Sequence, residues 1–186
     1  LRADLFFGAS DRLMAKSAGL IAAWLGWESL ALQEPVGLII PGGVEVEPRR
    51  GRRHLLGLLD AISSAYQTPA SDASAAETLE AASLSLGRGD EICLITDMPV
   101  DPTALAAHAR RLSRLRRMRL YLVEDRAISA GPPPGRYPSR GPDGLRRTPL
   151  VGKTGDDDGA ARRALTDAGW EVIPAMDILP RGVAAS

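Results

Sequence analysis

Two kinds of apolar pattern alternate along the chain, one typical of strands and the other typical of helices. Short apolar, β-branched runs predict strands, and the clearest of them is EICLIT, residues 91–96. The other expected strands lie at residues 36–40, 44–46, 119–123 and 170–173. Apolar residues at helical spacing predict helices at residues 10–32, from near Arg52, around Leu79 to Leu86, at 101–115 and at 158–168. This alternation is typical of parallel β–α units, so we expect an α/β fold with a three-layer, mostly parallel sheet and helices on both faces.

Two segments depart from that alternation. Residues 36–40 and 44–46 flank Pro41-Gly42-Gly43, which predicts one antiparallel edge hairpin. Residues 127–157 are rich in Pro and Gly and poor in apolar residues. Because proline has no N–H to donate to a ladder, we expect a long surface loop without regular secondary structure over most of that span.

The strand and helix assignments predict which side chains are buried where the first helix packs on the sheet. The expected core residues are Trp24, Ile39, Ile92, Leu94, Leu120 and Leu122.

Composition limits the function classes. The chain has 186 residues, 23 Lys and Arg against 23 Asp and Glu, one cysteine (Cys93) and two histidines. This length fits a single domain spanning residues 1–186. One cysteine excludes an intramolecular disulfide, and two histidines exclude a three-histidine metal site. No run reaches the roughly 18 apolar residues of a membrane span, so we expect a cytoplasmic protein. Since the chain begins at Leu1 without an initiator Met, we expect the natural protein to extend further upstream.

Ligand-binding and catalytic sites of a parallel sheet lie beyond the carboxyl ends of its strands. Asp97 follows the EICLIT strand at such a position. One interpretation is a carboxylate ligand for a hard divalent cation, in a metal-dependent hydrolase or nuclease that also uses Asp4 or Asp101. The other is a turn-capping Asp before Pro99, and we favour it. No nucleophile, base and orienting group come together in the sequence, so we expect no enzymatic activity and no cofactor.

Arginine is concentrated in two groups, residues 49–53 and 110–119. No aromatic residues alternate with these arginines, and the charge of the chain is balanced. The four-residue spacing of Arg110 and Arg114 is typical of a solvated helix face. We therefore expect no nucleic-acid partner.

Several motifs in the right order resemble a bacterial domain-of-unknown-function family, family fifty-eight. They are Phe7-Gly8, Trp27, Val36-Gly37, Pro48 to Leu56 with its Arg-Arg-Gly-Arg-Arg segment, LITD at residues 94–97 and VEDRAISAGPPPGRY at residues 123–137. The resemblance implies a von Willebrand factor A-like, Rossmann-like fold and a protein partner, such as an AAA+ ATPase of the MoxR type. It also implies a first strand in the middle of the sheet, supplied either by residues 3–7 or by a segment missing from this chain.

The same resemblance implies a cation site built on an Asp-x-Ser-x-Ser motif, a Thr and a later Asp. One register places Arg2 and Asp4 at the serine positions, and a second places Ser10 and Arg12 there. A guanidinium in either register repels a divalent cation. We therefore expect a degenerate site that binds no metal, with Asp97, Asp4 and Ser10 as its vestiges. The function expected is that of a non-enzymatic interaction module.

Overall fold

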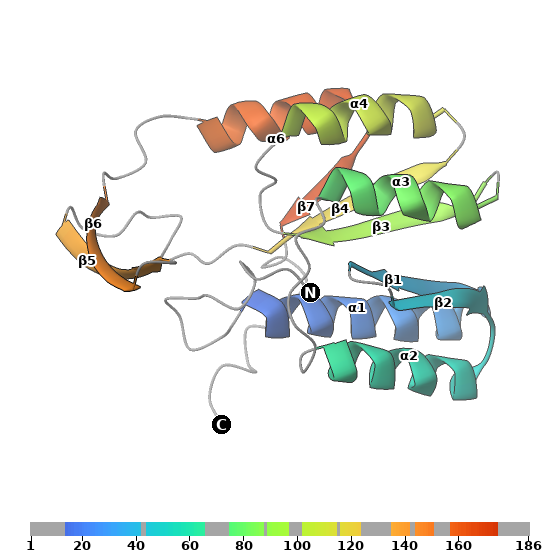
Figure 1. The fold of residues 1–186 in the computed structure, drawn as a ribbon. Helices are drawn as coiled ribbons and strands as arrows, with labels where there is room; N and C mark the ends of the chain where they lie inside the picture. The colour runs from blue at the N-terminus through green and yellow to red at the C-terminus, as the bar shows by residue number, and fades with distance from the viewer. Residues whose placement is uncertain are drawn as a thin grey trace.

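The computed structural model describes residues 14–41, 44–65, 75–87, 89–96, 102–114, 116–123, 135–141, 144–150 and 157–174 (Figure 1). Its centre is a parallel sheet of three strands, β3 (Glu91–Thr96), β4 (Arg117–Leu122) and β7 (Glu171–Pro174), in the order β3-β4-β7. The register pairs Leu94 with Leu120 and Leu120 with Val172. This parallel arrangement confirms the expected α/β class.

Helices cover both faces of this sheet. Because side chains alternate along a strand, Ile92, Leu120 and Leu122 point to one face, where they pack with α3 (Ala75–Ser85), α4 (Pro102–Leu112) and α6 (Asp157–Asp167). Tyr121 and Val123 point to the other face, where they pack on α1 (Met14–Ala31). Helix α2 (Arg52–Ala65) packs beside α1, below it in Figure 1, and also contacts the segment of residues 36–49. The described elements therefore form the three layers that the sequence predicts.

The expected hairpin is confirmed, but it forms its own sheet. Strands β1 (Val36–Ile40) and β2 (Val44–Arg49) pair in antiparallel orientation, and within the described part of the chain neither pairs with the parallel sheet. A carbonyl only accepts hydrogen bonds, so the His54 ring must donate from Nε2 to the Val36 oxygen, 2.8 Å away. This bond ties the start of α2 to the start of β1.

The expectation of an irregular loop at residues 127–157 is wrong for its central part. Strands β5 (Gly135–Gly141) and β6 (Gly144–Leu150) form an antiparallel hairpin there. Pro138 pairs with Arg147 and Pro149 with Arg136, so both prolines fall on the same alternate set of pairs. An antiparallel ladder has one such set whose N–H groups point away from the partner strand, and proline is tolerated there. Proline at such positions breaks no ladder hydrogen bond, so its missing N–H does not exclude a strand.

The expected core is partly wrong as well. Ile92, Leu120 and Leu122 are buried, while Leu94 and Ile39 are only partly buried. Trp24 is 43% exposed, against the prediction. Helix α1 is apolar around most of its circumference, so its sequence does not single out one face. In the structure Ala18 and Ile21 face the sheet, which turns Trp24 toward the surface.

A glycine ends α6 in the geometry of a Schellman motif. The Trp170 N–H donates to the Leu165 carbonyl at 3.1 Å, and the Gly169 N–H donates to the Thr166 carbonyl at 2.9 Å. Gly169 has a φ of 104°, and a Cβ built on it would lie 2.6 Å from the Ser113 Cβ. Leu165 and Trp170 are both in the core, so this turn orients β7.

We predict that Gly169→Ala lowers the free energy of unfolding by about 1–3 kcal/mol, because it adds left-handed strain and a contact with Ser113. Urea denaturation measures the loss. The matched control is Gly89→Ala, since Gly89 has a φ of 92° but nothing within 4 Å of its built Cβ. A loss no larger than that of the control would contradict the role of the contact with Ser113.

No helix in the described segments is both long and apolar enough to cross a bilayer.

Candidate functional site

A cavity of about 750 Å³ lies between the hairpin and the parallel sheet, and we call it the β1–β3 cavity. It is lined by every residue of β1 and every residue of β3. Since successive side chains of a strand point to opposite faces, a cavity that touches all of them follows the strand edge rather than one face. Figure 1 shows β1 and β3 running side by side in the same direction, with α1 below and α3 above in the view.

The edges that face this cavity have no strand partner among the described residues. Strand β1 pairs with β2 and β3 pairs with β4, each along one edge. Both strands line the β1–β3 cavity along their whole length, and Glu45, Val46 and Pro48 of β2 and Arg117 and Arg119 of β4 contribute to it as well. Unpaired strand edges carry a row of backbone donors and acceptors that favour the addition of another strand.

The two other walls come from helices on opposite faces. Helix α1 contacts both strands, and α3 contacts β1. The residues that these segments contribute to the cavity are small or apolar, namely Ala18, Gly19, Ala22 and Leu25 from α1, Leu79 and Ala82 from α3, and Leu86 directly after α3. A chain placed between the strands would therefore be covered by apolar surface on both sides.

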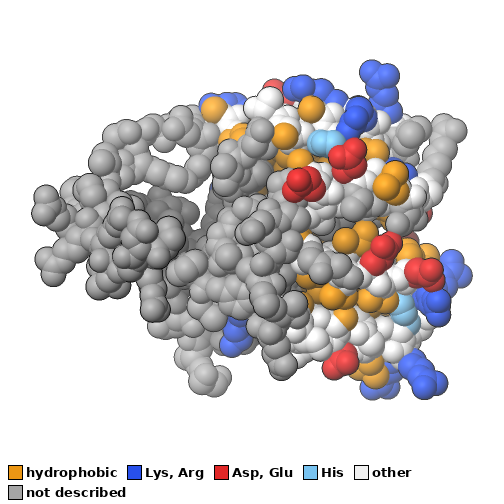
Figure 2. Space-filling model, in the orientation of Figure 1, with side chains coloured by type: hydrophobic (Ala, Val, Ile, Leu, Met, Phe, Trp, Pro, Cys, Tyr) orange, Lys and Arg blue, Asp and Glu red, His pale blue; other side chains and the backbone are white. Residues whose placement is uncertain are grey.

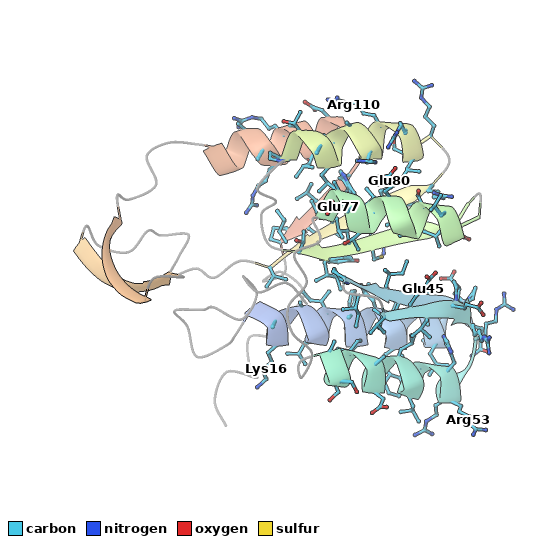
Figure 3. All side chains as sticks on the ribbon, viewed as in Figure 1. Lys16, Glu45, Arg53, Glu77, Glu80 and Arg110 are labelled. Carbon is cyan, nitrogen blue, oxygen red and sulfur yellow. The ribbon has the colours of Figure 1, made fainter. Side chains whose placement is uncertain are left out.

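Acidic side chains gather where β1 and β3 begin. The charged residues that line the cavity at this end, within the described part, are Glu28, Glu34, Asp90 and Glu91 against Arg117 and Arg119, whereas Glu45 lies beside the other end of β1, paired with Ile39. The Glu34 N–H donates to the Ser29 carbonyl at 2.9 Å, which holds Glu34 at the end of α1. Figure 2 shows acidic side chains beside hydrophobic ones on this face, and Figure 3 labels Glu45 on the hairpin.

Both arginines at this end are already engaged in ion pairs. Arg119 lies 2.9 Å from Glu91 and 3.3 Å from Glu171, and Arg117 lies 3.3 Å from Glu171. These contacts link the first residues of all three parallel strands. These ion pairs are exposed or partly exposed, so each adds little stability. Because both arginines are paired, the acidic residues leave this end of the cavity with an excess of negative charge.

Cys93 lies on β3 and lines the cavity, where part of its surface is exposed while its thiol is withdrawn from bulk solvent. Loss of solvation, together with the nearby charge of Glu91, raises the pKa of its thiol to about 12. The Arg119 guanidinium opposes this shift and is outweighed. A thiol with such a pKa stays protonated at neutral pH and is a poor nucleophile.

We predict that Cys93 reacts with iodoacetamide at pH 8 roughly 50-fold more slowly than a free cysteine. The scarcity of thiolate is partly offset by the greater nucleophilicity of a more basic thiolate. Mass spectrometry follows the reaction, and the urea-unfolded chain is the control because it restores ordinary reactivity. Equal rates in the folded and unfolded chains would contradict the raised pKa.

The vestigial metal candidates Asp97, Asp4 and Ser10 lie outside the described residues. The last residue before Asp97, Thr96, is buried, and its carbonyl accepts the Val123 N–H at 2.8 Å. Among the residues that are described, no three His, Cys, Asp or Glu side chains form a group that could hold a metal ion. The prediction that no metal binds near Asp97 stays a prediction.

The arginine-rich segment at residues 110–119 has a structural role that its spacing did not reveal. Arg116 is partly buried and donates to three carbonyls at the end of α3, those of Ser83 at 3.3 Å, Leu86 at 2.5 Å and Gly87 at 3.0 Å. A cation here also complements the negative end of the helix dipole. The bonds span about thirty residues of sequence. No local pattern could have indicated them.

Comparisons with known proteins bear on the fold. No family model matches the chain, and no curated protein is similar to it. A solved structure, the conserved hypothetical protein BatB from Bacteroides thetaiotaomicron, is similar to it with a TM-score of 0.62 and 14% sequence identity. The match covers 95% of this chain and 90% of that one. At this identity the likeness supports the arrangement of the elements alone.

Proposed function

We propose that this chain is a cytoplasmic, non-enzymatic von Willebrand factor A-like module that docks a protein partner, in a system with a MoxR-type AAA+ ATPase. The observation that carries the docking role is the β1–β3 cavity, which is bordered by two unpaired strand edges and by apolar helix surface. The order of motifs from Phe7 to Tyr137 supports the family, and the likeness to BatB supports the fold.

The chemistry of the cavity suits binding better than catalysis. Its titratable groups stand at the amino ends of the strands, and its one thiol stays protonated. Both histidines are described, and neither lines the cavity. His54 holds the hairpin, and His108 contacts Arg111 on the surface of α4. A polypeptide partner would bind through hydrogen bonds to the backbone of β1 and β3 and through contacts with the apolar walls of the cavity.

The alternative is a metal-dependent hydrolase or nuclease that uses Asp97 just beyond β3. Ligands of parallel sheets collect at that carboxyl edge, which gives the alternative a specific position. It requires oxygen ligands around a hard cation, whereas docking at the β1–β3 cavity requires none.

We predict that isothermal calorimetry with Mg²⁺ or Mn²⁺ at millimolar concentration gives no saturable heat, and that Asp97→Ala leaves the titration unchanged. In parallel, a purified MoxR-type AAA+ ATPase is expected to bind the chain in a surface-binding assay. A saturable cation signal that disappears in Asp97→Ala, together with hydrolytic turnover, would instead establish the enzyme. Absence of ATPase binding would refute the proposed partner class.

A further inference from the structure

We propose that two copies of this chain associate through the outer face of α1, in an antiparallel arrangement that pairs Leu20 with Trp24 and Lys16 with Glu28 across a twofold axis. The occupant of this surface is thus a second copy of the chain. The surface lies on the side of α1 that does not line the β1–β3 cavity. The inference therefore depends neither on what fills that cavity nor on the proposed docking function.

The outer face of α1 is apolar and exposed. Leu20, Trp24 and Trp27 follow one another at spacings of four and three residues, so they lie along one side of the helix, and we call them the outer apolar stripe. They are 37%, 43% and 45% exposed, and they make up three of the six large apolar side chains that are exposed in the described part of the chain. Clusters of exposed apolar side chains mark interaction sites, and tryptophan is a frequent anchor of protein interfaces.

The other sides of α1 already have neighbours. Ile21 shares a core cluster with Tyr121 of the sheet. Gly26 lies so close to α2 that a Cβ added to it would collide with Leu55. Ala22 lines the β1–β3 cavity, whereas no member of the outer apolar stripe does. Within the described structure, the stripe is therefore the side of α1 that is open to another molecule.

Charge selects a second copy of the chain as that molecule. The two charged residues of α1 are Lys16 in its first turn and Glu28 in its last turn, and both are exposed. Figure 3 shows the Lys16 side chain pointing away from the sheet at the start of α1. Each charge is at the helix end where the macrodipole disfavours it, because cations are favoured at the carboxyl end and anions at the amino end. An antiparallel second copy reverses both effects, since its α1 brings a carboxylate and a negative dipole end to Lys16.

One register satisfies the apolar and the charged contacts together. When Lys16 is level with Glu28 of the second copy, Leu20 is level with Trp24, because both pairs share one midpoint along the helix. Lys16 and Trp27 are eleven residues apart, which is about three turns, so they lie on the same side of α1. The Lys16 ammonium of one copy can therefore also approach the Trp27 ring of the other. A twofold axis makes every one of these contacts occur twice.

Sedimentation velocity of the full chain, over a concentration range of about 1 to 300 μM, tests the association. One helix face makes a small interface, so we expect a monomer–dimer equilibrium with a dissociation constant of roughly 10–100 μM. A chain that stays monomeric over the whole range would overturn the proposal. Vesicles that contain phosphatidylglycerol test the other surface that attracts exposed tryptophans. Binding of the monomer to them through Leu20 and Trp24 would replace the second copy by a lipid surface.

Single variants locate the interface. Leu20→Asp is expected to weaken dimerisation at least about tenfold, because it places a carboxylate against Trp24 of the second copy. The matched control is Leu84→Asp, since Leu84 is 85% exposed on α3, which covers the opposite face of the sheet. This control should dimerise as the unchanged chain does. Equal losses in the two variants would contradict an interface on α1.

A charge exchange tests the pairing of Lys16 with Glu28. Lys16→Glu alone is expected to weaken dimerisation about fivefold at low salt, because like charges then face each other. Lys16→Glu combined with Glu28→Lys is expected to dimerise at least about threefold more tightly than Lys16→Glu, since opposite charges face each other again. Thermal unfolding is the check on folding, and Lys16→Glu should not unfold earlier, because a carboxylate suits the amino end of a helix. A double variant no tighter than Lys16→Glu would refute this pairing.

Cross-linking determines the orientation of the two helices. In a Cys93→Ser background, copies with Lys16→Cys are mixed with copies with Glu28→Cys and treated with a short bismaleimide linker. We expect a cross-link between the two kinds of copy, whereas Lys16→Cys alone should give little, because positions 16 and 28 are about 18 Å apart along the helix axis. The Cys93→Ser chain must dimerise like the unchanged chain for this result to count. Cross-linking of Lys16→Cys with itself as fast as with Glu28→Cys would refute the antiparallel arrangement.

Discussion

Leu120→Ala is expected to lower the free energy of unfolding by about 2–5 kcal/mol. Leu120 is fully buried on β4, the middle strand of the parallel sheet, and pairs with Leu94 on one side and Val172 on the other. It lies in the core cluster between the sheet and the helices α3, α4 and α6. Truncation there removes methyl groups from between packed elements that cannot all move inward, so a cavity is left.

Urea denaturation followed by circular dichroism measures this effect. Leu56→Ala is the matched control, because Leu56 is 50% exposed on α2 and its truncation should cost less than about 0.5 kcal/mol. An equal, small loss in both variants would mean that Leu120 is not in a packed core. That outcome would overturn the placement of β4 at the centre of the sheet.

Arg116→Ala is expected to lower the free energy of unfolding by about 2–4 kcal/mol. The Arg116 guanidinium donates to the carbonyls of Ser83, Leu86 and Gly87, which lie in or just after the last turn of α3. Carbonyls at a helix end have no partner within the helix. Removal of the donor leaves partly buried acceptors unsatisfied and also removes a cation from the negative end of the dipole.

The control is Arg114→Ala, which deletes an exposed arginine two residues away and should change stability little. Amide exchange gives a second measurement, because loss of the cap should speed exchange in the last turn of α3 more than in α4. Equal exchange in the two helices of Arg116→Ala would contradict the capping role. Arg116→Lys should recover only part of the stability, since an ammonium cannot reproduce the guanidinium fork.

Local sequence signals determined most of the secondary structure. The EICLIT strand has the expected limits, residues 91–96, because a β-branched apolar run between turn residues satisfies every local preference for a strand. The hairpin around residues 41–43 and the helix beginning at Arg52 were predictable as well, because Pro-Gly-Gly favours a turn and the leucines after Arg52 recur at helical spacing. The three-layer α/β arrangement follows from their order, because each element must bury its apolar face against another.

Prediction from the sequence failed where one local rule is compatible with two structures. Pro138 and Pro149 can end a strand or occupy its non-bonding positions, and only the pairing register of β5 and β6 distinguishes the two. Trp24 lies on a helix that is apolar on most sides, and packing of Ala18 and Ile21 on the sheet decided which side is inside.

The sequence by itself determined that this protein is an α/β chain of balanced charge whose single cysteine cannot form an intramolecular disulfide. The tertiary structure alone decided that Cys93 lines a cavity, that Arg116 caps a helix some thirty residues earlier, and that β1 and β3 contribute to one cavity. Each of these depends on residues distant in sequence that meet only when the helices pack on the sheet. Hydrophobic periodicity reports which face of an element is buried, but not which other element buries it.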